Sequence, residues 1–385
     1  MDSSSVLIVG GGITGCAAAW ELARSGATVR VLEKRDLASM GSGRTLAGVR
    51  QSGRHPAEMP LAMAAVRRWE TLHDELDADL EYRQDGNLRL AEDAADAAFI
   101  QKMAETQRSL GLDIRYLDGN DEVRGVAPAL SETISGAAFT PSDGHANPIA
   151  TVRAYATAAE RAGAQFESGV TVSALAHDGD RVTGVETDRG TYQAEQVVVA
   201  AGVETPNILK SAGLEFAISL AMVPVVQTVP INPLFKQVLG TAKAHFAARQ
   251  EVDGRVRFSS GGRPIDVSTE GLTRDIMQPG CGRTAETLSR AVAIIPVLAE
   301  APISQIWGGL VDLTADGIPV IDRVTELEGL TVAAGFCGHG FCLGPVSGEI
   351  IRDLVLGRTS RFDLEPFRWN RSVAHENADS PELLG

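Results

Sequence analysis

Residues 6–33 contain the pattern that most constrains how this chain can fold. Four apolar residues lead into the run GGGITG at residues 10–15, small residues follow at helical length, and a second apolar run ends at Glu33. A strand, a glycine turn, a helix and a second strand make the βαβ unit that binds the diphosphate of a nucleotide. The pattern therefore predicts an α/β fold with a Rossmann-type nucleotide-binding domain.

The residues of this unit each have a physical role. Gly10 lets the strand turn sharply into the helix, Gly12 lets a phosphate approach the backbone, and Gly15 lets the helix pack closely. The unpaired N–H groups at the start of the helix then face the phosphates. Glu33 lies 23 residues after Gly10, where a carboxylate can accept hydrogen bonds from ribose hydroxyls. A carboxylate here disfavours NADP and leaves NAD and FAD as candidates.

Composition excludes several kinds of partner. The net charge of −15 over 385 residues argues against nucleic acid and against an anionic membrane surface. No apolar run approaches the roughly 20 residues of a membrane span. The N-terminal MDSSS has no basic region of the kind that begins a signal peptide. The four cysteines have no zinc-binding spacing, so we expect no metal site and a cytoplasmic location.

Hydrophobic periodicity indicates a mixture of helices and strands along the chain. We expect helices over residues 56–78, 92–111, 149–163 and 345–357, and strands over 164–175, 181–187, 191–200, 223–231, 255–260 and 329–335. The α/β segments alternate with β-rich ones, which predicts a nucleotide domain made of separate pieces and a second, antiparallel-sheet substrate domain inserted between them. The expected pieces are 1–78, 142–216 and 312–385 for the first domain, and 79–141 and 217–311 for the second. A continuous division into two domains is the alternative.

Two downstream segments decide between NAD and FAD. The strand-like VVVAAG at 197–202 ends in a glycine turn, and GFCGHGF at 335–341 leads into the final helix, with IPVID at 318–322 upstream. Together with residues 6–33, this pattern resembles the D-amino acid oxidase/sarcosine oxidase (DAO) family of FAD-dependent oxidoreductases. The resemblance covers essentially the whole chain. It is greatest to the branch of the sarcosine oxidase β-subunit and the opine or hydroxyproline dehydrogenases.

This resemblance implies a cofactor and a reaction. The cofactor is FAD, and the reaction is oxidation of the C–N bond of an amino acid or secondary amine by hydride transfer from Cα to flavin N5, followed by hydrolysis of the imine. Oxygen or another electron acceptor, and a homo-oligomer or heteromeric complex, are the partners it implies. Three alternatives stay open: an FAD-dependent 2-hydroxy acid dehydrogenase, a flavin-carrying subunit of a heteromeric dehydrogenase, and an NAD(P)-dependent dehydrogenase.

The resemblance also assigns candidate site residues. The N–H groups of the glycine-rich turn and of the final helix can stabilise the negative charge of a reduced flavin. Arg50 matches an arginine that assists the substrate site, and His339 and Arg257 are the other catalytic candidates. The residues expected to contact FAD are Gly10, Gly12, Ile13, Thr14, Gly15, Glu33, Lys34, Ser42, Arg44, Thr45, Gly48, Val49, Val170, Ala200, Gly202, Gly338, Gly340, Phe341, Cys342 and Leu343.

Three departures from the family pattern refine the expectation. The stretch 307–311 lacks the cysteine that links flavin covalently in monomeric sarcosine oxidases, so we expect non-covalent FAD. Cys342 stands where those enzymes have a lysine that grips the substrate carboxylate, which disfavours sarcosine as substrate. No lysine lies near Arg257, where oxidases of this branch carry one that promotes reaction with oxygen, and this favours a dehydrogenase.

Overall fold

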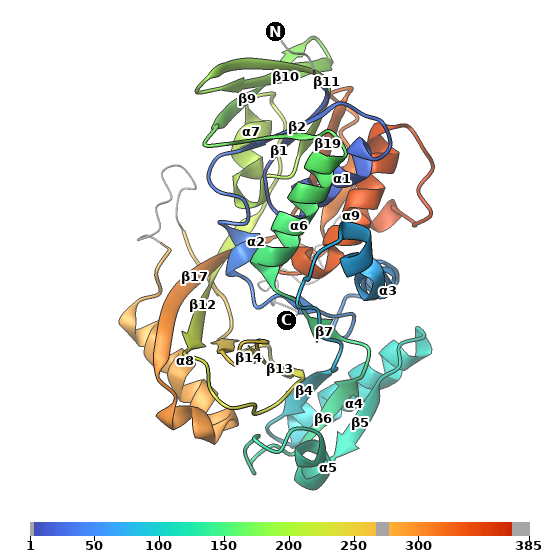
Figure 1. Cartoon of the computed structure of the whole chain (residues 1–385). Coiled ribbons are helices and arrows are strands. Elements are labelled where there is room, and N and C mark those ends of the chain that lie inside the picture. The colour runs from blue at the N-terminus through green and yellow to red at the C-terminus, as the bar shows by residue number, and fades with distance from the viewer. Residues whose placement is uncertain (1–3, 267–276, 372–385) are drawn as a thin grey trace.

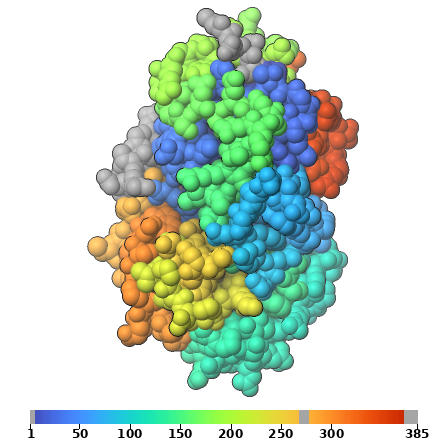
Figure 2. All heavy atoms as spheres, in the orientation of Figure 1, coloured from blue at the N-terminus to red at the C-terminus, as the bar shows by residue number. Residues whose placement is uncertain are grey.

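The computed structural model describes residues 4–266 and 277–371, and within these residues the chain builds two large sheets. An eight-stranded sheet lies in the upper half of Figure 1, and a nine-stranded sheet lies in the lower half. The space-filling view shows the two segments of the lower sheet, near residues 80–140 and 240–310, side by side below the rest (Figure 2). Strands of each sheet therefore come from separate stretches of sequence.

The upper sheet is mainly parallel and has the order β18-β19-β11-β1-β2-β8, with the hairpin β9-β10 attached to β11. Its strands are β1 (Ser4–Val9), β2 (Val29–Glu33), β8 (Gln165–Ser168), β9 (Val172–Asp178), β10 (Arg181–Thr187), β11 (Gly190–Val199), β18 (Val320–Arg323) and β19 (Leu330–Ala334). The fully buried residues of β1 face both ways: Ile8 packs among the helices, and Leu7 packs toward the hairpin. This two-sided burial is typical of a parallel sheet.

Three helices cover one face of this sheet: α1 (Ile13–Ala23), α6 (Pro148–Arg161) and α9 (Gly340–Val355). Helix α3 (Met59–Leu76) packs on α9, and α7 (Thr205–Lys210) packs by β9 on the other face. A short α2 (Gly41–Arg44) and the paired strands β3 (Gly48–Val49) and β7 (Gly144–His145) lie between the two sheets. The N-termini of α1 and α9 thus lie at the edge of the sheet that faces the lower domain.

The lower sheet has the order β16-β12-β15-β14-β13-β4-β6-β5. Strand β17 lies outside this order and pairs with β12 along its whole length. Its strands are β4 (Asn87–Ala91), β5 (Arg115–Asp118), β6 (Gly136–Thr140), β12 (Ser219–Thr228), β13 (Val238–Thr241), β14 (Ala247–Gln250), β15 (Val256–Ser259), β16 (Arg263–Pro264) and β17 (Ile303–Leu313). The pair β4–β13 is parallel although we expected an antiparallel sheet. These two strands come from different insertions, so no hairpin sets their relative direction.

The remaining helices flank this sheet and extend its core. They are α4 (Ala94–Ser109), α5 (Gly119–Val126) and α8 (Cys281–Ile294), with 3₁₀ turns at Gly202–Glu204, Pro296–Glu300 and Glu365–Phe367. None of the helices within residues 4–266 and 277–371 combines the length and the apolar character that crossing a membrane demands. Cys16, Cys281, Cys337 and Cys342 are all free thiols.

The structure confirms most expected elements and corrects two. The helices expected at 56–78, 92–111 and 149–163 are α3, α4 and α6, within three residues at each end. The expected strand at 164–175 is two strands, because Gly169 turns the chain with a φ of +73°. The last helix begins at Gly340, and Pro345 lies inside it rather than at its start. The domain bounds themselves stay a prediction, and residues 372–385 of the last piece lie outside the described residues.

Candidate cofactor and substrate site

A continuous pocket runs from the carboxyl ends of β1, β2 and β11 to the face of the lower sheet. Ligands of open α/β sheets bind at this edge, where the chain crosses to opposite sides of the first strand. The lining comes from the glycine turn 10–14, from 33–35, 38–42, 44–46 and 200–204, from the turn 336–341, and from 223, 225, 259–262 and 309–312 of the lower sheet. The upper sheet thus forms one end of the pocket and the lower sheet forms the other.

The glycine turn has the geometry that the sequence predicts. Gly10 has a φ of +114°, and a Cβ there would collide with the carbonyl oxygen of Ala200. A Cβ on Gly15 would collide with the carbonyl oxygen of Gly10, so this glycine lets α1 pack directly against the turn. A Cβ on Gly12 would meet only Ser42 Oγ, at 3.0 Å. Apart from Ser42, no side chain of the described residues stands before Gly12 at the start of α1, so a diphosphate can approach the backbone there.

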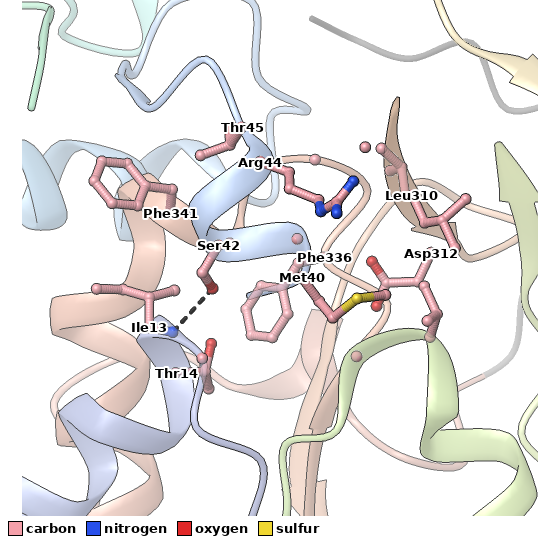
Figure 3. Close-up of a pocket in the computed structure, with 18 of the residues that line it drawn as sticks. Ile13, Thr14, Met40, Ser42, Arg44, Thr45, Leu310, Asp312, Phe336 and Phe341 are labelled. Carbon is pink, nitrogen blue, oxygen red and sulfur yellow. Dashed lines mark hydrogen bonds between the residues drawn. The ribbon is translucent and has the colours of Figure 1, made fainter. Parts of the chain in front are cut away.

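Ser42 reaches the same helix start from α2. Its Oγ accepts a hydrogen bond from the N–H of Ile13 at 2.9 Å, and Figure 3 shows the side chain pointing toward this nitrogen. Because a helix N-terminus leaves its first N–H groups without partners inside the helix, this contact satisfies one of them. The segment around Ser42 consequently forms the pocket wall beside the start of α1, the phosphate end of the pocket in our expectation.

Glu33 stands at the carboxyl end of β2 and lines the pocket. Its two oxygens accept hydrogen bonds from the N–H groups of Gly11, at 2.6 Å, and Arg35, at 2.7 Å. Lys34 and Arg35 both pair with Glu204, at 2.7 and 3.0 Å. The acid predicted for ribose contacts thus also ties the glycine turn to the loop that follows β2.

A second helix start lines the pocket where β19 leads into α9. Gly338, His339, Gly340 and Phe341 line the pocket at the helix start. Asp312 on β17 supports this turn: one side-chain oxygen accepts from the N–H of Gly335 at 2.8 Å. Burial raises the pKa of Asp312 to about 6. The exposed N–H groups of a helix start at this point can stabilise negative charge on a bound ring.

His339 is held by a buried carboxylate. Its Nδ1 lies 3.0 Å from Glu58 Oε2, and both side chains are buried. Burial alone would raise the pKa of Glu58, but His339 and Arg54 beside it lower that pKa below its usual range. His339 lines the pocket while its ring contacts Glu58, the residue just before α3, so its catalytic role stays a prediction.

Arg50 places a guanidinium in the pocket that can bind a ligand. It lines the pocket, and its guanidinium makes no hydrogen bond or ion pair with the part of the chain that the structure describes. Burial, together with the nearby Arg54 and Arg89, lowers the pKa of Arg50 to about 9. Arg50 is partly exposed at the pocket, so a ligand anion can reach its guanidinium and add to the charge that Asp143 already supplies.

Asp143 holds the segment that carries Arg50. This fully buried carboxylate accepts a hydrogen bond from the N–H of Gln51 at 2.9 Å, and further hydrogen bonds from the N–H and hydroxyl of Ser52. Cys342 donates from Sγ to the carbonyl oxygen of Arg50 at 3.3 Å. Contacts from two other parts of the chain therefore hold the backbone from the carbonyl of Arg50 to Ser52.

The catalytic role expected of Arg257 stays a prediction. Arg257 does not line the pocket, although Ser259, on the same face of β15, does. Its guanidinium donates to the carbonyl oxygen of Thr45 at 2.8 Å, pairs with Glu251 at 3.0 Å and lies 5.1 Å from the centre of the Trp307 ring. These three neighbours surround the guanidinium of Arg257, which lies behind the pocket wall.

The structure brings most of the predicted residues together. The pocket is lined by the predicted Gly10, Gly12, Ile13, Thr14, Glu33, Lys34, Ser42, Arg44, Thr45, Gly48, Arg50, Val170, Ala200, Gly202, Gly338, His339, Gly340 and Phe341. Gly15, Val49, Cys342 and Leu343 lie behind this lining. The last two turn into the core because α9 begins before them.

Sequence reasoning missed Asp312, Arg54, Glu58 and Asp143. Asp312 has one local signal, its position shortly before the IPVID segment, but its partner Gly335 is 23 residues away. The other three have no motif, since their roles depend on contacts made across the fold.

Comparisons with known proteins agree with this geometry. The family model described as DAO, FAD dependent oxidoreductase, matches residues 5–354. Sarcosine oxidase subunit beta of Arthrobacter sp is 28% identical over 389 residues, which cover 98% of this chain and 94% of that protein. Glycine oxidase of Geobacillus kaustophilus (strain HTA426) is 27% identical over 383 residues, covering 96% of this chain and 97% of that protein. The crystal structure of glycine oxidase from Geobacillus kaustophilus has a TM-score of 0.90 to this fold at 26% identity, covering 97% of this chain and 100% of that one.

Proposed function

This chain belongs to the family of FAD-dependent oxidoreductases, and we propose that it oxidises the C–N bond of an amino acid or secondary amine that carries a carboxylate. Bound FAD supplies the acceptor for the hydride that leaves the substrate Cα, and the imine is then hydrolysed by water. The observation that carries the proposal is the available guanidinium of Arg50 in the pocket. The relatives named above act, by their names, on sarcosine and glycine, which are both amines with a carboxylate.

The protein holds its FAD without a covalent bond in this proposal. Residues 307–311 contain no cysteine, and the pocket cysteine, Cys337, is a poor nucleophile. Its thiol contacts Thr314 and donates to the carbonyl oxygen of Gly335, at 3.3 Å each. Burial raises the pKa of Cys337 to about 12, so the reactive thiolate does not form at neutral pH.

Arg50 anchors the substrate carboxylate. A thiol cannot replace an ammonium group in this role, and Cys342 is turned away toward the backbone of Arg50. Arg54 also lines the pocket, but Glu58 lies 3.5 Å from its Nε and balances its charge. An arginine fork binds a carboxylate through two parallel N–H groups, which also fixes the orientation of the Cα–H bond.

The electron acceptor is a molecule other than oxygen in this proposal. Among the lining residues, Lys34 is the one lysine, and it pairs with Glu204 near the glycine turn. The end near Asp312 has arginines but no lysine within the described lining. A heteromeric complex would fit such an acceptor, since one relative carries the name of a subunit.

Four free cysteines favour a reducing compartment such as the cytoplasm.

The rival with a 2-hydroxy acid as substrate uses the same pocket and the same carboxylate anchor. The names of the relatives favour the amine. Anaerobic addition of amino acids, N-alkyl amino acids, opines and 2-hydroxy acids, with loss of flavin absorbance as the readout, separates the two. Bleaching by an amine supports the proposal, and bleaching by hydroxy acids alone overturns it. Admitting oxygen afterwards tests the acceptor, because rapid return of the absorbance would identify an oxidase.

The variant Arg50→Gln tests the anchor. Loss of a charge-assisted hydrogen bond costs about 1.5–3 kcal/mol, so KM for the carboxylate substrate rises roughly 10- to 150-fold. A matched amine without the carboxylate changes little, which distinguishes an anchor from general damage. The control is Arg181→Gln, which removes an exposed arginine paired with Glu328. Equal KM values for Arg50→Gln and the parent protein would contradict the role.

A further inference from the structure

The segment 38–47 carries the phosphate-end wall of the pocket and is held by the lower sheet. Trp307 Nε1 on β17 donates to the carbonyl oxygen of Arg44 at 3.1 Å, and the guanidinium of Arg44 donates back to the carbonyl oxygen of Gly308 at 2.9 Å. Arg257 on β15 donates to the carbonyl oxygen of Thr45 at 2.8 Å. Three hydrogen bonds from two strands therefore meet two consecutive residues.

Local sequence explains why the strand and the segment can come so close. Residues 308 and 309 of β17 are both glycines, and a Cβ on Gly309 would lie 3.5 Å from the carbonyl oxygen of Arg44, an ordinary van der Waals distance. The strand therefore meets the segment without a side chain between them at this position. Helix α2 lies against β17, and Figure 3 shows Arg44 beside Leu310.

The backbone of the segment supplies a second observation. Ala38 and Ala47, at its two ends, have φ values of +59° and +54°, and both are buried. Alanine rarely adopts this left-handed conformation, which persists when the surrounding structure over-determines it. The segment is therefore held from outside in a shape that it does not prefer by itself.

We infer that Trp307, Arg257 and Arg44 form an interdomain clamp that positions Ser42 and the segment 38–47 to retain FAD. Ser42, two residues before Arg44, contacts the N–H of Ile13 at the start of α1. Loss of the clamp frees the segment to move away from α1, which opens the phosphate end. Trp307 and Arg257 are thus positioning residues for the cofactor, although they belong to the sheet that lines the substrate end.

Arg257 shares its carboxylate partner with other side chains, so a test variant at this position has to keep the positive charge. Arg257 pairs with Glu251 at 3.0 Å, and Glu251 also pairs with Arg249 at 2.8 Å and accepts from Gln227 Nε2 at 2.6 Å. Arg257→Lys keeps a positive charge by Glu251 but loses the planar fork that serves both Glu251 and Thr45. Trp307→Phe keeps an aromatic ring beside Arg257 and removes the N–H to Arg44.

The test measures release of FAD from the holoenzyme after dilution, followed by the rise in flavin fluorescence, with no substrate present. One neutral hydrogen bond corresponds to about 3- to 10-fold in affinity, so Trp307→Phe releases FAD faster by about that factor, and Arg257→Lys also releases it faster. The control is Trp369→Phe, which removes an indole N–H bond to Glu326 outside the pocket lining. The measurement requires FAD binding but no turnover, so it stands apart from the proposed substrate.

Three outcomes decide the inference. Faster release from both clamp variants, with the melting temperature of the flavin-free protein unchanged, supports it. Release no faster than that of Trp369→Phe overturns it. Faster release that merely accompanies a lower melting temperature of the flavin-free protein overturns it too, because general loosening of the fold would then account for the loss of FAD.

Discussion

Replacing Gly348 with alanine tests whether the packing of α1 against α9 sets the shape of the cofactor site. A Cβ on Gly348 would lie 2.7 Å from the backbone carbon, 2.8 Å from the carbonyl oxygen and 2.9 Å from the Cβ of Ala17. Ordinary contacts are about 3.3 Å to oxygen and about 3.5 Å between carbons. The two helices must therefore separate locally by about 0.5–0.8 Å. The N-terminal residues of both helices line the pocket, so the separation affects its shape.

Two opposing effects determine the stability of this variant. Alanine is better than glycine inside a helix by about 1 kcal/mol, which favours the substitution. Overpacking a well-filled contact costs about 1–3 kcal/mol, and here the colliding atoms are backbone atoms that cannot rotate away. Because these atoms cannot move aside, we place the steric cost at the upper end of its range, about 2–3 kcal/mol, and expect a net loss of about 1–2 kcal/mol. With an unfolding entropy of about 2 cal/mol/K per residue, this lowers the melting temperature by about 1–3 °C.

Calorimetry and flavin release measure the two consequences. Separation of the helices moves the N–H groups that face the cofactor beyond hydrogen-bond distance, so FAD release accelerates about tenfold. The control is Gly282→Ala in α8, where a Cβ meets no atom within 4 Å, and its melting temperature should rise slightly. A Gly348→Ala protein as stable as Gly282→Ala, with FAD release unchanged, would refute the packing argument.

Two further predictions concern buried acids of the site. Asp143→Asn places an amide N–H₂ against an N–H donor of Gln51 or Ser52, so the free energy of unfolding falls by about 1–3 kcal/mol. Because this loosens the segment that carries Arg50, the substrate KM rises by a larger factor than kcat falls. A loss of kcat with an unchanged KM would contradict this. The pKa of Asp312 is about 6 in the folded protein and 3.8 for an unperturbed group. Between about pH 4 and pH 6 the folded protein therefore holds a proton on Asp312 that the unfolded chain has lost. Stability therefore falls as the pH rises from about 4 to about 6, and Asp312→Asn flattens this fall in urea unfolding midpoints; an unchanged pH profile would count against the assignment.

The cofactor end of the site could be predicted from sequence because its parts are local. The strand, turn and helix of residues 6–33 are adjacent in the chain, and each glycine has a requirement that no other residue meets at low cost. The same holds for the turn at 335–341, which joins β19 directly to α9. Short-range patterns of this kind specify backbone geometry whatever the rest of the chain does, and the family resemblance depends on them.

Tertiary structure alone decided which side chains face the pocket in the lower domain. Arg257 and Ser259 share one face of β15, yet Thr45, 212 residues from Arg257 in the chain, covers the first and leaves the second at the pocket. Asp143 supports Arg50 through a neighbour 92 residues away, and Cys342 turned into the core because α9 begins at Gly340. Periodicity gives the face of an element but not what packs on it. The sequence by itself therefore predicted where the cofactor pocket lies, and long-range packing decided that Arg50 lines this pocket and Arg257 does not.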